Sequence, residues 1–380
     1  MIKVGYGITV LSRCMAENSV DGIGSYTNEL LNRFYERDDV ELVPFGFNTQ
    51  IPSELLSHNT PVQLGGFAKG ALCSGITSLP FLGGEVLSER VDLVHATDHL
   101  IPKLRKTPVI ATLMDAIPLS HPEWVTYRYR ALKNALWRKS SHWADHILTI
   151  SEYSKSEIET HFGISERKIT VIPLAVDQRW FSDISDQTSL EVSKRLKLPK
   201  SYYLFVGTLQ PRKNVRRVIE AHQSLPSATR EEFPLIIVGR EGWDSDVADG
   251  LKTGRYGDKI SWLQYLDLSD LYTVVSLAKS LVFPSLHEGF GLPVLEAMAA
   301  GTPVITSNNT SLPEVAGEAA LLVDPLDVTD IANAMLKVVS DTLLADTLTA
   351  KGVTRARQFT WERCAEETVG VYKNVLGKSA

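Results

Sequence analysis

Short runs of β-branched and aromatic residues recur along the chain and alternate with segments that have the spacing of amphipathic helices. The first half contains IKVGYGITV, VELVPFGF, VDLVHAT, TPVIATLM, HILTIS and ITVIPL, and the second half contains YYLFVGTL, PLIIVG, ISWLQYL, SLVFPS, PVITS and AALLVD. Several runs are apolar at nearly every position, which is typical of strands buried on both faces. The pattern therefore predicts an α/β fold with parallel sheets covered by helices on both sides.

The alternation pauses at residues 175–200, where the sequence is polar and rich in turn residues. A chain of 380 residues also exceeds the usual size of a single core. We therefore expect two doubly wound, Rossmann-like domains that face each other across a cleft, residues 1–178 and 201–359, with a linker region at 179–200. The last helical pattern, within 360–380, is free to pack back on the first domain.

Composition narrows the class of protein. The net charge of −6 gives no global reason to expect a nucleic acid partner. Cys14, Cys73 and Cys364 lie far apart, which fits buried thiols in a reducing compartment better than a disulfide or metal framework. The sequence shows no signal peptide and no apolar run of about 18 residues. We expect a cytoplasmic protein that can touch the inner face of a membrane.

A candidate phosphate site lies in LFVGTLQPRKNVRRVIEAH, residues 204–222, which has the pattern of a strand, a turn and a helix. Arg212 and Lys213 fall in the loop just before that helix. A helix N-terminus favours anions, and two cations beside it complete a phosphate site. The alternative is a solvated charge pair on a βα loop.

A glycine turn, VDGIGSYTNELL at residues 20–31, opens the first long helical pattern, with Ser25 as a natural N-cap. Thr27 occupies the third glycine position of a dinucleotide fingerprint, so a nicotinamide site is weakly supported. Gly22 and Gly24 permit close approach of a ligand to the backbone, or form a tight turn without a ligand.

The stretch HEGFGLPVLEAMAAG, residues 287–301, places Glu288 and Glu296 around a glycine-rich loop. Pro293 suits the first turn of a helix and Gly301 its C-terminal end. The bare amides of the loop would then form an anion cradle, with Glu296 one turn into the helix, where it could accept hydrogen bonds from a vicinal diol such as ribose. Stabilisation of the helix N-terminus by either glutamate is the structural alternative.

These stretches resemble a known family. EGFGLPVLEAMAAGTPVI resembles the E-x7-E signature of retaining GT-B glycosyltransferases of family 4 (group 1). VGTLQPRKN resembles the phosphate loop of that family, in the form common among bacterial O-antigen and polysaccharide mannosyltransferases, and GIGSY resembles its first glycine loop. The resemblance is dense from residue 202 to 327 and diffuse before that.

The resemblance implies a role for each matching residue. Glu288 would be catalytic, contacting hydroxyls of the transferred sugar, and Glu296 would hold the ribose. The other expected donor-binding residues are two cations for the diphosphate, two residues beside the base and two glycine-containing loops: Arg212, Lys213, Tyr265, Leu266, Gly22, Gly24, Gly289, Phe290, Gly291 and Leu292. The resemblance implies a nucleotide sugar as co-substrate, with no other cofactor and no metal.

One position departs from the family pattern. In VIATLMDAIPLSHPEW, Met114 stands where the family usually has a histidine near the sugar and the acceptor. Asp115 follows it and is the second catalytic candidate, either orienting the acceptor hydroxyl or only capping the loop. His121 lies six residues further on, and nothing in the sequence gives it the missing role.

An acceptor or membrane surface is indicated by EWVTYRYRALKNALWRKSSHWADH, residues 123–146, in which cations are interleaved with aromatic residues. Such a mixture suits a lipid diphosphate or an anionic bilayer. The alternative is a helix that covers the sheet with its aromatic residues inward. The residues taken as acceptor or membrane contacts are Arg128, Arg130, Lys133, Trp137 and Arg138.

Together these features predict a metal-independent retaining mannosyltransferase that uses GDP-mannose and acts on a polyprenyl-diphosphate-linked or oligosaccharide acceptor in bacterial O-antigen or lipopolysaccharide synthesis. A rhamnosyl-, glucosyl- or galactosyltransferase would carry much the same motifs. A non-catalytic nucleotide-sugar-binding protein is the further alternative, motivated by Met114.

Overall fold

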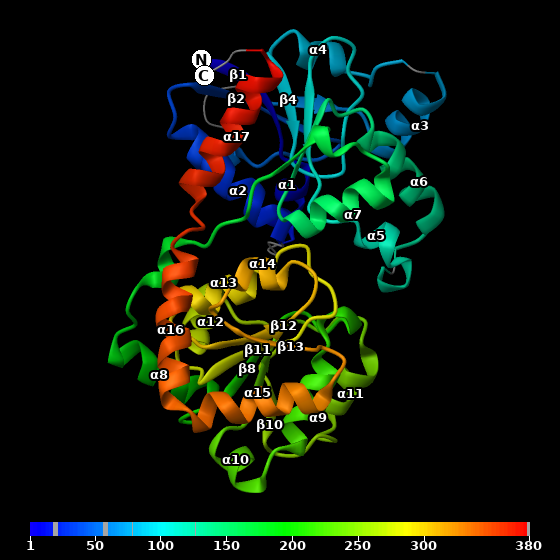
Figure 1. Ribbon diagram of the computed structural model, residues 1–380. Helices are drawn as coiled ribbons and strands as arrows, with labels where there is room; N and C mark the ends of the chain where they lie inside the picture. The colour runs from blue at the N-terminus through cyan, green and yellow to red at the C-terminus, as the bar shows by residue number, and fades with distance from the viewer. Residues whose placement is uncertain (18–21, 56–59, 78, 126, 378–380) are drawn as a thin grey trace. The chain divides into compact units, whose positions relative to one another are not determined.

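The chain divides into two compact units (Figure 1), which we examined in a computed structural model that describes residues 1–17, 22–55, 60–77, 79–125 and 127–377. The first unit comprises Met1–Leu174 together with Trp361–Ala380, and the second comprises Ala175–Thr360. Each unit is built around its own sheet. Within the described residues, no helix is both long enough and apolar enough to cross a bilayer.

The first unit contains a parallel sheet in the order β3-β2-β1-β4-β5-β6-β7. Its strands are β1 Ile2–Gly7, β2 Val40–Phe47, β3 Val62–Leu64, β4 Leu93–Ala96, β5 Val109–Thr112, β6 His146–Thr149 and β7 Ile169–Val171. Its helices are α1 Thr9–Ala16, α2 Gly22–Tyr35, α3 Phe67–Thr77, α4 Gly84–Ser88, α5 Ile117–Ser120, α6 Arg130–Ser141, α7 Glu152–Phe162 and α17 Trp361–Val375, with short 3-10 turns η1 Ser53–Leu55, η2 Pro122–Trp124 and η3 Glu166–Lys168.

The second unit contains a parallel sheet in the order β10-β9-β8-β11-β12-β13. Its strands are β8 Tyr203–Val206, β9 Leu235–Val238, β10 Ile260–Trp262, β11 Ser280–Phe283, β12 Val304–Ser307 and β13 Leu321–Val323. Its helices are α8 Asp186–Leu196, α9 Val215–Ser224, α10 Ser227–Glu232, α11 Ser245–Lys252, α12 Leu268–Ser276, α13 Leu292–Ala299, α14 Leu312–Ala316, α15 Val328–Ser340 and α16 Thr342–Ala356, with 3-10 turns η4 Gln178–Phe181 and η5 Pro211–Lys213.

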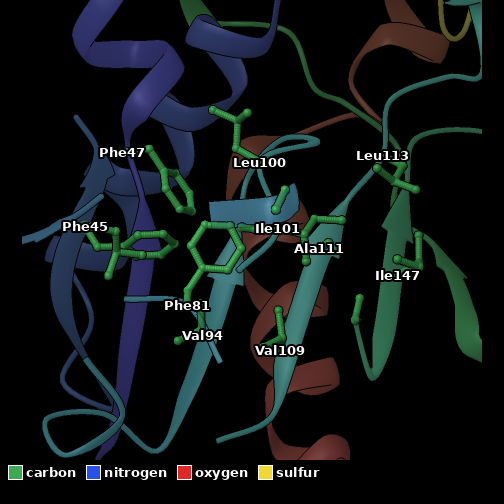
Figure 2. Close-up of a cluster of buried hydrophobic side chains, with 14 of the residues drawn as sticks. Phe45, Phe47, Phe81, Val94, Leu100, Ile101, Val109, Ala111, Leu113 and Ile147 are labelled. Atoms are coloured by element: carbon green, nitrogen blue, oxygen red, sulfur yellow. The ribbon is translucent and has the colours of Figure 1, made fainter. Parts of the chain in front are cut away.

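Each predicted apolar run contains a strand, and the pattern missed only β3 among the strands described. β3 has three residues, Val62–Leu64, too few to show a period. The central strands are buried at every position, for instance throughout β4, β5, β9 and β11, because helices cover both faces of each sheet. Figure 2 shows one such core, where the Phe81 ring is directed toward Phe45 and Phe47 beside Val94.

The expected linker at 179–200 is instead part of the second unit. It contains η4 and α8, and α8 is capped by Ser185, whose side chain accepts from the amide of Thr188. Arg195 on α8 donates to Asp270 on α12, with 2.8 Å between Nη1 and Oδ2. The sequence pattern did not predict this helix, because most of its residues are exposed and leave no clear apolar period.

The final helix, α17, belongs to the first unit. Its Tyr372 hydroxyl hydrogen-bonds His95 Nδ1 on β4 at 2.6 Å, and the other ring nitrogen of His95 bonds the Thr112 hydroxyl at 2.8 Å. Burial lowers the pKa of His95 to about 3, so the ring stays neutral. Trp361 at the start of α17 contacts the Tyr26 ring on α2.

Candidate functional site

The second sheet has a switch point between β8 and β11. β9 and β10 lie on one side of this pair and β12 and β13 on the other, so the chain leaves the two strands in opposite directions. Ligands of doubly wound sheets bind at the carboxyl ends of strands at such a point. The loop after β8 carries Arg212 and Lys213, and the loop after β11 carries Glu288.

The conformation of the loop after β8 is fixed by Asn214. This residue ends η5 with a left-handed backbone, φ 62°, and begins α9. Its buried side-chain amide donates to the carbonyls of Pro284 at 2.8 Å and Pro325 at 2.7 Å. Asn214 therefore holds the loop that carries Arg212 and Lys213 against the loop that follows β11.

Close backbone packing fixes the neighbouring loop as well. Gly239, directly after β9, has φ 149°, and a Cβ there would lie 2.0 Å from the carbonyl oxygen of Gly207. Only glycine can occupy this position without moving the backbone. The loops after β8 and β9 thus touch at the edge of the sheet.

Glu288 lies at the centre of an ion cluster. The carboxylate is buried and accepts from Lys213 Nζ at 2.6 Å, from Arg212 Nη1 at 3.1 Å and from Ser285 Oγ at 2.7 Å. Burial alone raises the pKa of Glu288, but the charges of Lys213 and Arg212 and their hydrogen bonds outweigh it and bring the pKa to about 2. The carboxylate is therefore ionised and engaged by three donors.

Arg212 makes a second contact with the loop after β11, because its Nη1 also donates to the carbonyl of His287 at 3.0 Å. The Lys213 ammonium in addition lies over the Phe283 ring, 5.1 Å from its centroid. The sequence analysis did not identify Ser285. Its position three residues before Glu288, on the same loop, could have indicated a contact between the two side chains. Both cations are thus held rigidly at the switch point.

Three backbone amides of the glycine-rich loop before α13 have no acceptor among the described residues. Gly291 has φ 109° and caps the helix, and a Cβ there would meet Leu312 at 2.6 Å. The Ser311 hydroxyl contacts the carbonyls of Glu288 and Phe290 at 2.9 Å each. Within the described part of the chain, the amides of Phe290, Gly291 and Leu292 donate to no other residue. Together with Gly289 they form the helix N-terminus that the sequence predicted as an anion cradle.

Glu296 differs from Glu288 in its surroundings. It lies one turn into α13 and is half-buried. In the residues that the structure describes, its carboxylate has no hydrogen-bond or ion-pair partner. Burial raises the pKa of Glu296 to about 7. A ligand that donates two hydrogen bonds to it would stabilise its ionised form.

The loop after β10 carries the two residues expected beside the base. Tyr265 is exposed, and the Arg240 guanidinium lies 4.3 Å from the centroid of its ring. Leu266 is half-buried beside it. The amide of Gly239 donates to the carbonyl of Gln264 at 2.6 Å, which ties this loop to the end of β9. An aromatic ring backed by a cation therefore lies at the carboxyl edge of the second sheet.

In the first unit, α2 begins at Gly22, and Ser25 lies inside the helix instead of capping it. Asp21, which precedes the helix, falls outside the described residues. A Cβ at Gly22 would meet nothing within 4 Å, so a ligand can approach the backbone there. Gly24 is buried. The helix start is thus four residues earlier than the N-cap pattern predicted, at Gly22 instead of Tyr26.

A cavity of about 550 Å³ opens at the carboxyl ends of β4 and β5 in the first unit. Asp115 lines it and accepts from the amide of Ile117 at 3.0 Å, and Asp98 accepts from the amide of Leu100 at 2.6 Å. Much of the wall is apolar. The cavity is lined by Arg13, Ile23, Phe67, Ala68, Asp98, His99, Leu100, Thr112, Leu113, Met114, Asp115, Pro118, Tyr127, Lys133, Leu136 and Trp137.

Met114 lines this cavity, so a thioether stands where the family histidine is expected. His121 is not among the lining residues. It stacks on Trp124 with 3.9 Å between ring centroids, and its Nδ1 lies 3.0 Å from Glu123 Oε1. His121 is thus engaged by surface contacts outside the cavity. Asp98 and Arg13 do line the cavity, and the sequence analysis did not identify them.

The five residues expected at the acceptor surface separate into two groups. Lys133 and Trp137 line the cavity, and Trp137 packs against His99 and Phe162. Three cations lie on the exterior: Arg138 is exposed, Arg128 covers the Tyr129 ring, and Arg130 donates to the carbonyl of Pro122. Trp137, the aromatic residue of α6, thus faces inward as in the structural alternative, whereas Tyr129 before the helix is exposed.

Comparison with known proteins identifies the family of this chain. A model described as glycosyl transferases group 1 matches residues 186–355, and one described as glycosyltransferase family 4 matches residues 20–180. The chain is 37% identical over 286 residues to the O-antigen chain mannosyltransferase B of Escherichia coli, covering 74% of each chain. It is 31% identical to the serotype-specific mannosyltransferase WbdA of Escherichia coli, over 62% of this chain and 29% of that longer protein.

The fold is also shared with solved structures. Anabaena HepE in complex with UDP and glucose superposes with a TM-score of 0.75 at 15% identity, over 98% of this chain and 100% of that one. This likeness confirms the predicted fold class of two Rossmann-like α/β domains. The two family models together span most of the chain, and the E-x7-E stretch lies at the switch point of the second sheet. The chain therefore belongs to the group 1 glycosyltransferases of family 4.

Proposed function

We propose that this glycosyltransferase transfers mannose from GDP-mannose, with retention of anomeric configuration and without a metal, to an oligosaccharide or polyprenyl-diphosphate-linked acceptor in bacterial cell-surface polysaccharide synthesis. The observation that carries the proposal is the cluster of Arg212, Lys213 and Glu288 beside open amides at the switch point of the second sheet. The choice of mannose is supported by the names of the relatives, two of which are O-antigen or serotype mannosyltransferases.

The leaving group determines which residues matter most. When the bond between the anomeric carbon and the diphosphate oxygen breaks, both electrons stay on the nucleoside diphosphate. Arg212, Lys213 and the N-terminus of α13 supply positive charge for that anion. Because the two cations are already fixed by Glu288, little reorganisation is needed when the charge develops.

Retention requires the acceptor oxygen to bond the face that the diphosphate leaves. Glu288 is a poor base or nucleophile, because two cations and Ser285 bind its carboxylate and its pKa is about 2. In this mechanism the proton of the acceptor hydroxyl passes to the departing phosphate oxygen. Glu288 orients the cations and contacts hydroxyls of the sugar.

The nucleoside is assigned to the neighbouring loops. The unpartnered carboxylate of Glu296 accepts hydrogen bonds from the two ribose hydroxyls. The base lies against the backbone near Tyr265 and Leu266, where the aromatic ring is exposed. These contacts leave the diphosphate between the loop after β8 and the glycine-rich loop before α13.

The acceptor is assigned to the cavity of the first unit. A largely apolar wall with a few polar groups is typical of ligand sites of this volume. Asp115 orients the acceptor hydroxyl, and the aromatic and aliphatic side chains contact the apolar face of the acceptor sugar. Lys133 at the wall pairs with an anionic group of the acceptor.

The proposal is tested by nucleotide release. Purified protein is incubated with GDP-mannose, UDP-glucose, UDP-galactose or dTDP-rhamnose, with and without a polyprenyl-diphosphate-linked oligosaccharide and with and without a chelator. We expect GDP release that depends on GDP-mannose and on the acceptor and that persists with the chelator, and an α-linked product by NMR. Release from another nucleotide sugar alone would overturn the mannose assignment. An inverted product or loss of activity with the chelator would overturn the mechanism.

A further inference from the structure

His99 lies in the loop after β4 and lines the cavity of the first unit. Its ring is half-buried, and neither ring nitrogen is sealed from solvent. Among the described residues, neither nitrogen has a hydrogen-bond or ion-pair partner. Other histidine rings in the described chain do have such a partner: His95, His121, His142, His146, His161 and His222. His99 therefore presents an imidazole that a ligand in the cavity can bind.

The backbone on both sides of His99 is fixed. The buried Thr97 hydroxyl donates to the carbonyl of Gly7 at 2.7 Å, and the Asp98 carboxylate accepts from the amide of Leu100 at 2.6 Å. Leu100 itself belongs to the core of the first unit (Figure 2). The loop thus leaves His99 little freedom to turn away from the cavity.

The ring of His99 is oriented by Trp137 on α6. The two rings meet edge to face, with 5.1 Å between their centroids. Trp137 is held in turn by Phe162, at 5.3 Å between centroids. The buried indole Nε1 of Trp137 has no acceptor in the part of the chain that the structure describes. The wall around His99 therefore contains polar groups that the protein itself leaves unmatched.

Two carboxylates share the cavity with His99. In the register of neighbouring strands β4 and β5, the last residue pair lies three residues before His99 on one strand and three before Met114 on the other. Asp98 and Asp115 adjoin these two residues and also line the cavity. The thioether of Met114 is only a weak acceptor. At this carboxyl edge, His99 is thus the side chain that can both donate and accept.

We propose that His99 recognises a hydroxyl of the acceptor sugar, with the carboxylates of Asp98 and Asp115 accepting from other hydroxyls of the same acceptor. A neutral imidazole has one donor and one acceptor, which matches a hydroxyl, whereas a carboxylate only accepts. Arg13 and Lys133 also line the cavity, but the Asp98 carboxylate next to His99 disfavours a phosphate at the imidazole. The inference rests on the proposed function only in that the acceptor is assigned to this cavity.

The test measures sugar binding to the full chain without a donor. Methyl α-glycosides of mannose, galactose, glucose, rhamnose and N-acetylglucosamine are titrated by ligand-observed NMR, and the tightest binder is then compared with its monodeoxy forms. His99→Phe keeps an aromatic ring against Trp137 but removes both nitrogens. We expect it to raise the Kd roughly fivefold, the loss of one hydrogen bond. His99→Gln should stay within about twofold of the parent, because its amide keeps a donor and an acceptor.

The monodeoxy forms identify the hydroxyl that His99 binds. One of them should bind the parent roughly fivefold more weakly than the full glycoside does, yet bind His99→Phe as well as the full glycoside does, because the two deletions remove the same hydrogen bond. His121→Phe is the matched control, since His121 stacks on Trp124 outside the cavity, and it should bind as the parent does. Thermal unfolding checks that each variant folds, and His99→Leu repeats the test if His99→Phe does not.

Three results would refute the proposal: a parent chain that binds none of the glycosides, an unchanged Kd in His99→Phe, or binding of inorganic phosphate that this variant loses while glycoside binding stays. Glycoside binding that depends on His99 in a chain that transfers no sugar would instead count against the proposed function alone. The two inferences can therefore fail separately.

Discussion

The carboxyl edges of the two sheets occupy the same topological position but carry different chemistry. At the switch point of the second sheet, Glu288 is buried among Arg212, Lys213 and Ser285. At the corresponding edge of the first sheet, a largely apolar cavity of about 550 Å³ contains Asp115 and Met114. Topology therefore predicts the same position for a ligand in each unit, and the loops at that position differ in charge and polarity.

The two edges are also built in different ways. In the second unit, backbone contacts set the geometry: Asn214 bridges two carbonyls, and Gly239 admits no side chain. In the first unit, side chains from separate helices form the wall, such as Phe67 from α3 and Trp137 from α6. An exchange of side chains would therefore alter the first edge directly, whereas any side chain at Gly239 would displace the backbone of the second. We expect the four substitutions below to distinguish the functions of the two edges.

The largest effect should come from Lys213→Met. It removes positive charge from the leaving diphosphate and one of the two cations that hold Glu288. Loss of one preorganised donor of this kind reduces kcat by roughly 100-fold to 1,000-fold. The measurement is acceptor-dependent nucleotide release, with circular dichroism as a check on folding. Arg216→Met is the control: Arg216 pairs with Asp246 on the surface, and its turnover should stay within about twofold of the parent.

Glu288→Gln should separate turnover from binding. The variant keeps the side-chain shape but removes the negative charge that both cations now share. We expect turnover to fall roughly 100-fold, while GDP binds several-fold tighter because Arg212 and Lys213 are released toward its phosphates. Isothermal titration with GDP and a turnover assay measure the two effects. Normal turnover with weakened GDP binding would show that Glu288 acts only on the nucleotide.

In the first unit, Trp137→Ala should act on the acceptor alone. The indole forms part of the cavity wall, so its loss removes an apolar contact with the acceptor sugar. We expect the acceptor KM to rise roughly tenfold and the donor KM to stay unchanged. Trp124→Ala is the comparison, since Trp124 stacks on His121 and does not line the cavity. Equal effects on both KM values would contradict the assignment of the two edges.

The smallest effect concerns the pH dependence of GDP binding. Burial raises the pKa of Glu296 to about 7, and a ribose needs its ionised form as an acceptor. GDP affinity should therefore rise several-fold as the pH increases through 7, and Glu296→Gln should flatten that profile. A parent profile that is flat from pH 6 to about 8 would contradict a ribose contact at Glu296.

The pH dependence of stability gives an independent check on the pKa shifts of the two glutamates. The folded pKa of Glu296 lies above its ordinary value of 4.5, so its contribution to stability is complete below 4.5 and is lost as the pH rises toward 7. Glu288 has the opposite sign: its contribution is present above 4.5 and is lost as the pH falls toward 2. Thermal unfolding of Glu288→Gln and Glu296→Gln across this range should show opposite changes.

Much of the fold and part of the site were predictable from sequence because they depend on local patterns. Apolar runs located the central strands, and Pro293 and Gly301 bounded the helix that carries Glu296. The pairing of Glu288 with Lys213 was not predictable, because the two residues are 75 positions apart and meet only through the sheet order. Helix α8 was not predicted, although Ser185 caps it, because Val192 is its one buried residue and its other residues are polar or at least partly exposed. The start of α2 was misplaced because the helix begins at Gly22, before the Ser25 cap pattern.

The return of α17 to the first unit has a consequence for biosynthesis. The first unit consists of this C-terminal segment and a long segment that precedes position 175. The buried side chains of α17 include Trp361, Cys364, Val369 and Tyr372. A ribosome therefore finishes the second unit before it releases the helix that completes the first. Until then His95 lacks its Tyr372 partner and the apolar side of α2 stays uncovered. The nascent first unit is thus the stretch of chain most in need of a chaperone during translation.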